Sequence, residues 1–245
     1  MLGAGRKYQM RLAIAFGCVA VALTAASASF AAEIVSATYG QPTTRYQHGV
    51  LGDDIEYGAL EIALSDGSRV TLTLPESRVF EDLEPRLVDV DLDGAPEVVT
   101  VESSATQGAR LSIYDEMGLV AATPYIGRSN RWLAPISAAD LDGDGAVEIA
   151  YIDRPHLAKT LRIWRFENGN LNEVISKAGY TNHRIGWDFI VGGLRECDQG
   201  PEMIVATGNW SQIVSIKLDG NGSLSEKVVQ DYLGPDSFSE ALMCP

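Results

Sequence analysis

The sequence repeats itself at an interval of 51 residues, and this period constrains the fold more than any other feature. Gly67, Gly118 and Gly169 each close an alternating apolar stretch and are 51 residues apart. Glu97 and Glu148 keep the same step. A further step to Glu202 is 54 residues, which is a small insertion. A fixed period of about fifty residues predicts a repeat architecture.

Each period holds several short strands, and the third period is the clearest. Alternation and β-branched content predict strands at Pro135 to Asp140, Ala146 to Asp153, Thr160 to Phe166 and Leu171 to Ala178. Dipeptides that accept positive φ mark the turns. They are Asn168-Gly169, Asp66-Gly67 and Asp219-Gly220. The pattern is therefore that of an all-β chain.

Four-stranded units at this period are typical of a β-propeller, in which each blade covers its apolar faces with its neighbours. We expect about four four-stranded blades at residues 33–75, 76–126, 127–180 and 181–233, followed by a short tail. The alternative is a β-sandwich with irregular turns. A sandwich, however, gives no reason for a fixed step.

The N-terminal segment has the layout of a secretory signal peptide, which we expect to span residues 1–32. Arg6, Lys7 and Arg11 precede an apolar run from Leu12 to Ala26, with small residues after it. The alternative is a membrane anchor, but this run is shorter than the roughly 20 residues that a helix needs to cross a bilayer. With the signal removed, no membrane span is expected. The predicted location is the periplasm or the exterior.

Charge and cysteine content fit export. Removing residues 1–32 takes the formal charge from −14 to −17, because all three charges removed are basic. So acidic a chain lacks the clustered Lys and Arg that nucleic acid binding needs. The remaining cysteines, Cys197 and Cys244, form an even pair, which in an oxidising compartment suggests one disulfide. Two buried free thiols are the alternative.

Two loops repeat the pattern D-x-D-x-D-G-x-x-E at the interval of the blades. One runs from Asp89 to Glu97 and the other from Asp140 to Glu148. Oxygen ligands at alternate positions can converge on one hard cation, the sixth-position Gly permits the sharp turn, and the ninth-position Glu can close the shell. The oxygen-only set, without His or Cys, predicts Ca²⁺. The alternative is an acidic turn that only caps a hairpin.

The other two units lack a complete loop. The last unit has a decayed copy from Leu194 to Glu202, whose first position is apolar, so we expect weak binding or none. The expected disulfide would hold this loop instead. The first unit offers only Thr38 to Tyr46 at the corresponding place.

The two acidic loops, each followed by an apolar strand (98–101 and 149–152), resemble the FG-GAP or VCBS-type repeats of integrin-α-like β-propellers. The resemblance implies calcium ligands at the first, third, fifth and ninth loop positions and a backbone carbonyl at the seventh. The implied ligands are Asp89, Asp91, Asp93, Ala95 and Glu97 in one loop, and Asp140, Asp142, Asp144, Ala146 and Glu148 in the other.

No catalytic layout is recognisable, and His48, His156 and His183 are interpreted as surface or packing residues. Arginines recur at intervals of 53 before the innermost strands, where they could face the channel with nearby tryptophans and form a ligand pocket. These possible ligand-binding residues are Arg78, Arg131, Trp132, Arg184 and Trp187. Alternatively, the arginines join neighbouring blades by pairing with Glu81, Glu84 and Asp188.

Together these features favour an exported propeller that acts as a protein- or glycan-binding module, with calcium in a structural role. The alternative is a propeller-fold lyase or hydrolase that uses the channel arginines and an acidic partner. Neither the ligand nor the oligomeric state follows from the sequence.

Overall fold

The computed structural model describes residues 1–3 and 32–244. The predicted signal peptide, residues 1–32, therefore lies almost wholly outside the described residues. The chain divides into two units, Met1–Ala31 and Ala32–Pro245, and every described strand belongs to the second. Among residues 1–3 and 32–244, no helix has the length and apolar character that crossing a membrane requires.

The first sheet holds eight strands in the order β1-β2-β4-β6-β7-β8, with β3 beside β2 and β5 beside β6. It covers the first two repeat units. Tyr57 in β2 pairs with Phe80 in β4, and β4 in turn pairs with β6, so the two units share one sheet. The strands are β1 (Ile34–Thr43), β2 (Glu56–Leu64), β3 (Arg69–Thr73), β4 (Arg78–Phe80), β5 (Arg86–Val88), β6 (Glu97–Ser104), β7 (Gly108–Asp115) and β8 (Gly118–Ala122).

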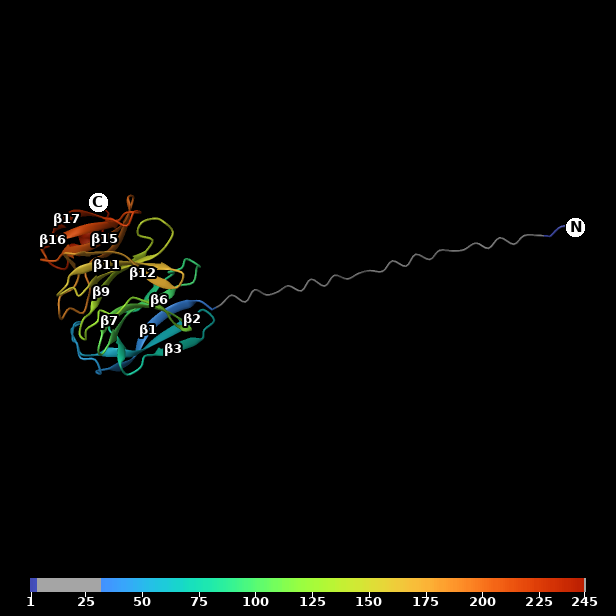
Figure 1. Cartoon of the computed structure of the whole chain (residues 1–245), viewed down its shortest axis with the longest axis horizontal. Coiled ribbons are helices and arrows are strands. Elements are labelled where there is room, and N and C mark those ends of the chain that lie inside the picture. Colours follow the sequence, from blue (N-terminus) through green and yellow to red (C-terminus); the bar gives the residue numbers. More distant parts are fainter. Residues whose placement is uncertain (4–31, 245) are drawn as a thin grey trace. The chain divides into compact units, whose positions relative to one another are not determined.

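Two further antiparallel sheets follow along the chain (Figure 1). The second is a four-stranded meander in which each strand pairs with the next. The third has five strands, with β13 and β14 both paired to β15. Their strands are β9 (Leu133–Ala139), β10 (Glu148–Asp153), β11 (Thr160–Glu167), β12 (Asn170–Ala178), β13 (Tyr180–Thr181), β14 (Gly193–Cys197), β15 (Gly200–Thr207), β16 (Gln212–Leu218) and β17 (Leu224–Asp231).

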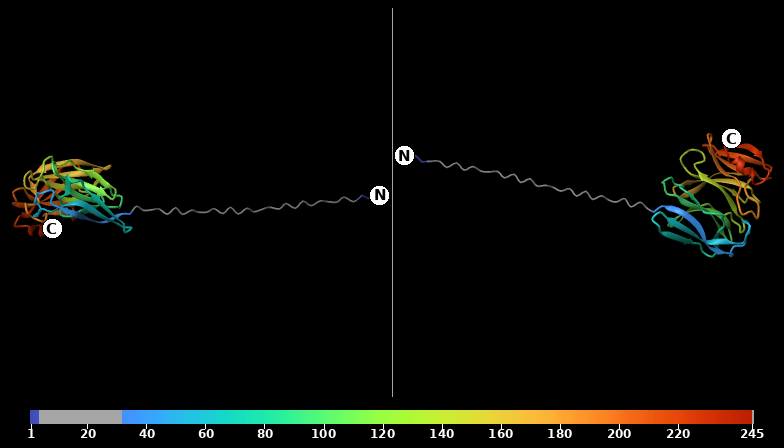
Figure 2. Two further views of the ribbon diagram at one scale, coloured as in Figure 1. Left: turned by 90° about the horizontal axis from the view of Figure 1, so that it is seen from below. Right: turned by 180° about the vertical axis from the view of Figure 1, so that it is seen from behind.

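The core lies between successive units, because each sheet buries its faces against the next. One cluster joins Val99 and Leu111 of the first sheet to Ile149 and Phe166 of the second. A second cluster joins the second sheet to the third. Figure 2 shows the sheets following one another in chain order within Ala32–Pro245. Successive antiparallel meanders with the core between them are the arrangement of a β-propeller, as the period predicted.

The repeating glycines lie at corresponding turns. Gly67, Gly118 and Gly169 lie in the hairpins that join β2 to β3, β7 to β8 and β11 to β12, and they have φ values of 87°, 138° and 74°. Positive φ is accessible to glycine because it has no Cβ. In the third unit, the four predicted strands correspond to β9, β10, β11 and β12 within two residues at each end.

The first unit differs from the four-stranded expectation because it holds three strands. Its hairpin at Gly67 matches the hairpin between the third and fourth strands of later units. By that correspondence β1, β2 and β3 are a second, third and fourth strand, and residues 32–75 provide no first strand. Thr38 to Thr43 continue β1 rather than forming a loop. This explains why no acidic loop occurs in that unit.

Candidate functional site

The first acidic loop connects β5 to β6 and draws its carboxylates together. Asp89, Asp91 and Glu97 each offer an oxygen within 4.8 Å of the others. The Asp89 carboxylate accepts bonds from the amides of Asp93 (3.1 Å) and Gly94 (2.9 Å). Gly94 has a φ of 98°, which allows the sharp turn. These contacts hold the loop in the compact shape that oxygen coordination needs.

Nothing positively charged neutralises this first loop. Among residues 1–3 and 32–244, no side-chain nitrogen of Lys, Arg or His lies within 4.0 Å of its carboxylates. Burial raises the pKa of Glu97; the amide of Val90 lowers it, and the charges of Asp91 and Asp93 raise it again. The cluster thus has an unbalanced negative charge, which a bound cation would relieve. The donor set fits calcium.

The second acidic loop connects β9 to β10 with the same backbone pattern. Asp140, Asp142 and Glu148 form a second group of oxygens within 4.8 Å. Glu148 accepts a bond from the amide of Leu141 at 2.9 Å, as Glu97 accepts one from Val90 at 2.9 Å. The seventh-position residues Ala95 and Ala146 use their amides to bond Asp93 and Asp144. Coordination by their carbonyls stays a prediction.

The second loop differs from the first because Arg165 lies against it. The Arg165 guanidinium contacts the carboxylates of Asp142 (2.6 Å), Asp144 (2.8 Å) and Glu148 (2.5 Å). Its hydrogen bond to Glu148 raises the pKa of Arg165. The other Asp142 oxygen, Oδ1, is buried without a hydrogen-bond partner. The loop therefore carries an internal cation and still has one unsatisfied oxygen.

Strand register explains the difference between the loops. Glu148 faces Arg165 across β10 and β11. In the first sheet Val98 faces Tyr114, and continuing this register by one residue puts Asp115 opposite Glu97. In the third sheet Met203 faces Ile216, which puts Lys217 opposite Glu202. The ninth-position Glu therefore faces an acid in one unit and a base in the next two.

The decayed loop near Cys197 is a tight hairpin held by other means. Cys197 and Cys244 form a disulfide, as the cysteine count suggested. Glu202 pairs with Arg195 at 2.5 Å and with Lys217 at 3.5 Å. In this unit the ninth-position Glu is neutralised by Arg195 and Lys217, and the disulfide holds the hairpin.

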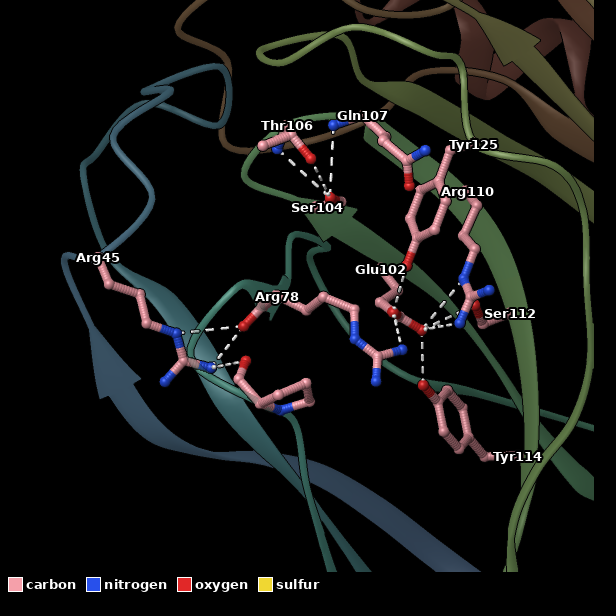
Figure 3. A network of polar contacts seen from close by, with 11 residues as sticks. Arg45, Arg78, Glu102, Ser104, Thr106, Gln107, Arg110, Ser112, Tyr114 and Tyr125 are labelled. Atoms are coloured by element: carbon pink, nitrogen blue, oxygen red, sulfur yellow. Dashed lines mark hydrogen bonds and ion pairs between the residues drawn. The ribbon is translucent and has the colours of Figure 1, made fainter.

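Arg78 pairs with Glu102 in a polar network inside the first sheet (Figure 3). It does not pair with Glu81 or Glu84, which the sequence suggested as partners. Its partner Glu102 is fully buried and also accepts bonds from Arg110, Tyr114 and Tyr125. Burial alone would raise the pKa of Glu102, but these donors lower it below its usual range. Arg78 therefore stabilises the sheet.

Arg184 lies among aromatic rings rather than against Asp188. Its guanidinium is 4.6 Å from the centre of the Trp210 ring and 5.8 Å from that of Trp187. These cation–π contacts stabilise the Arg184 guanidinium without an acidic partner. Of the predicted ligand-binding residues, only Arg131 and Trp132 line a common cavity.

That cavity, of about 260 Å³, also brings together histidines that the sequence left scattered. His48 and His156 line it, and His156 bonds His183 at 3.0 Å. The 51-residue step does not relate these histidines to one another, but it does relate the neighbours of the cavity wall, because Glu81, Trp132 and His183 are 51 residues apart. The Trp132 ring contacts both of the others. Equivalent positions of three units thus meet here.

Comparison with known proteins agrees with the repeat pattern. Residues 89–151 match the FG-GAP-like repeat, and this stretch begins at the first acidic loop and ends just after the second. No curated protein matches the chain. Among solved structures, it is similar to one described as "Crystal structure of exotype rhamnogalacturonan lyase YesX", with a TM-score of 0.39 and 17% identity. The match covers 68% of this chain and 34% of that one, so the chain spans about a third of that structure's length. The chain therefore carries an FG-GAP-like repeat at residues 89–151.

Proposed function

We propose that the protein is an exported β-propeller module that binds calcium in the loop of residues 89–97 and recognises a protein or glycan partner. The observation that carries the proposal is the charge of this loop. Three carboxylates, those of Asp89, Asp91 and Glu97, gather there, Asp93 lies in the same loop outside that group, and no basic side chain among the described residues lies within 4.0 Å of them. The carbonyl of Ala95 would complete the set. Oxygen-only ligands of this kind favour calcium.

Calcium in this loop would be structural. It would offset the mutual repulsion of the carboxylates and fix the turn between β5 and β6. We expect a dissociation constant on the order of 10⁻⁴ to 10⁻³ M, which is usual for extracellular modules.

The second loop would bind calcium more weakly. Its ligands would be Asp140, Asp142, Asp144, Glu148 and the carbonyl of Ala146. Arg165 already holds three of these carboxylates, so calcium must displace a guanidinium before it can bind. The unsatisfied Asp142 oxygen supports a residual affinity for cations.

Export is supported by the disulfide between Cys197 and Cys244, since such bonds persist in oxidising compartments. The leader pattern of residues 1–32 supports it as well. A net acidic surface argues for a partner other than nucleic acid.

Thermal unfolding with calcium or with a chelator tests the calcium site. At 10 mM calcium, binding in the expected range would add roughly 1.4–2.7 kcal/mol and raise the midpoint by roughly 3–10 °C. Asp91→Asn with Asp93→Asn should remove most of this rise. The matched control is Asp66→Asn, an exposed aspartate in another hairpin turn, which should keep it. An unchanged midpoint in the wild type would overturn the proposal.

A further inference from the structure

The cavity at Trp132 is assembled from four separate segments, and hydrogen bonds fix them together. The segments are the loop between β1 and β2, the residues before β9, the loop after β10 and the loop between β13 and β14. The amide of Gly186 bonds the carbonyl of Val50 at 3.1 Å, and the amide of Arg154 bonds the carbonyl of Trp132 at 2.9 Å. The cavity is therefore preorganised rather than formed by one mobile loop.

One wall of the cavity carries an unmatched positive charge. Arg131 donates a bond to the carbonyl of its neighbour Asn130 at 2.6 Å. In the described part of the chain, no carboxylate oxygen lies within 4.0 Å of its guanidinium. Arg154, which also lines the cavity, is instead paired with both oxygens of Asp153. Arg131 is thus the group available to a negatively charged ligand, and a guanidinium suits a carboxylate.

A second wall offers a hydrogen-bond acceptor. The carbonyl of Trp187 can only accept, so His183 donates to it through Nε2 and keeps a lone pair on Nδ1. That lone pair accepts the Nε2–H of His156, whose own Nδ1 is then left as an acceptor. Burial lowers the pKa of His156 to about 4, with the nearby His183 and His48 adding to the effect, so its ring is neutral at pH 7.

Apart from His48 and Asn130, the rest of the lining is apolar. Trp132 and Val50 are buried in the wall, and the exposed side chains of Leu157 and Ile185 stand at the rim. The Trp132 ring nitrogen already bonds the carbonyl of Glu81 at 2.8 Å, so this ring offers contact surface rather than a free donor. A ligand that fills about 260 Å³ here needs an apolar side.

We propose that this cavity binds a small hydroxy carboxylate. The carboxylate pairs with Arg131, a hydroxyl donates to Nδ1 of His156, and the carbon skeleton packs against Trp132. This inference goes beyond the proposed protein- or glycan-binding role, because it adds a small-molecule site. It does not depend on the calcium site.

Mandelate tests the inference because it combines a carboxylate, a hydroxyl and an apolar ring at a size below that of the cavity. Two close analogues each lack one feature: phenylacetate lacks the hydroxyl and mandelamide lacks the charge. Titrations followed by the indole NMR signal of Trp132, in calcium-containing buffer, should give millimolar binding of mandelate. Phenylacetate should bind about threefold to tenfold more weakly, and mandelamide at least tenfold more weakly.

Variants assign each contact. Arg131→Gln should weaken mandelate binding at least tenfold without changing the melting midpoint, because the side chain has only a carbonyl partner. His156→Phe should abolish the preference for mandelate over phenylacetate while phenylacetate still binds. The matched control is Arg128→Gln, because Arg128 is exposed, lies outside the cavity lining and should not affect binding.

Three results would overturn the inference: no shift of the Trp132 signal with mandelate, equal binding of mandelate and mandelamide, or equal losses from Arg131→Gln and Arg128→Gln. Repeating the titration in chelator separates it from the calcium proposal. If mandelate still binds but calcium does not change the melting midpoint, the calcium proposal is refuted and the cavity inference stands.

Discussion

A single residue across the sheet decides how each acidic loop is neutralised. The ninth-position Glu faces Asp115 in the second unit, Arg165 in the third and Lys217 in the fourth. Two loops with nearly the same sequence therefore differ in the charge that surrounds them. Among the described residues, the loop opposite Asp115 has no basic side chain within 4.0 Å of its carboxylates, whereas the loop opposite Arg165 has a cation built into the neighbouring strand.

Replacing Arg165 should turn the weaker loop into a second calcium site. Arg165→Gln frees the carboxylates of Asp142, Asp144 and Glu148. We expect the number of calcium ions bound at 10 mM calcium to rise from near one to near two per chain. In chelator the variant should lose about 1–3 kcal/mol of stability, because the carboxylates have lost their counter-charge. Arg69→Gln, in an exposed strand position, is the control. Unchanged stoichiometry would contradict this interpretation of Arg165.

Glu56 should make stability depend on pH. Burial, with the charges of Glu81, Asp53 and Asp82, raises the pKa of Glu56 to about 9. The unfolded value is about 4.3, so between these values the folded state binds a proton that the unfolded state releases. The contribution of Glu56 to stability is present below about pH 4.3 and is lost as pH rises towards 9. The slope approaches about 1.4 kcal/mol per pH unit.

Urea unfolding at pH 6 and pH 8 measures this effect. The wild type should lose stability relative to Glu56→Gln between the two values, since glutamine does not titrate. Glu61→Gln, at an exposed position, should behave as the wild type does. Parallel pH profiles for the wild type and Glu56→Gln would show that Glu56 is ionised in the folded protein.

At the scale of elements, the C-terminal tail is held against the third sheet by apolar packing, a disulfide and a hydrogen bond. The helix α1 (Ser237–Ala241) buries Phe238 against Val191 and Ile204. Beyond it, the disulfide joins Cys244 to Cys197 in β14, and Arg195 donates to the carbonyl of Ala241 at 2.7 Å. The C-terminal tail therefore packs against the third sheet and is covalently joined to it.

Removing the disulfide should destabilise the protein and loosen this tail. The bond closes a loop with a sequence separation of 47 residues, for which chain entropy predicts up to about 4 kcal/mol. Cys197→Ser with Cys244→Ser should lower the unfolding free energy by a large part of that amount in urea. Hydrogen exchange should speed up in α1 and β14, while β10 and β11 stay protected. Equal stability of the variant and the oxidised wild type would contradict this expectation.

At the scale of the whole molecule, periodicity predicted the elements that each unit repeats. The turn glycines, the strands of the third unit and the two acidic loops follow from local alternation and spacing. The three-stranded composition of residues 33–75 did not follow, because β1 has the alternation of any strand. Arg165 was missed since its role depends on register between strands. The cavity was missed since its histidines come from loops far apart in sequence.

The bond between Gly186 and Val50 joins residues that lie more than half the chain apart. During synthesis, the acidic loops leave the ribosome well before the segment that completes the cavity wall. A nascent chain therefore contains both acidic loops before the segment that completes the cavity has been made. A chain that ends before residue 180 lacks Gly186 and Ile185, so only the longer chain can assemble this cavity wall.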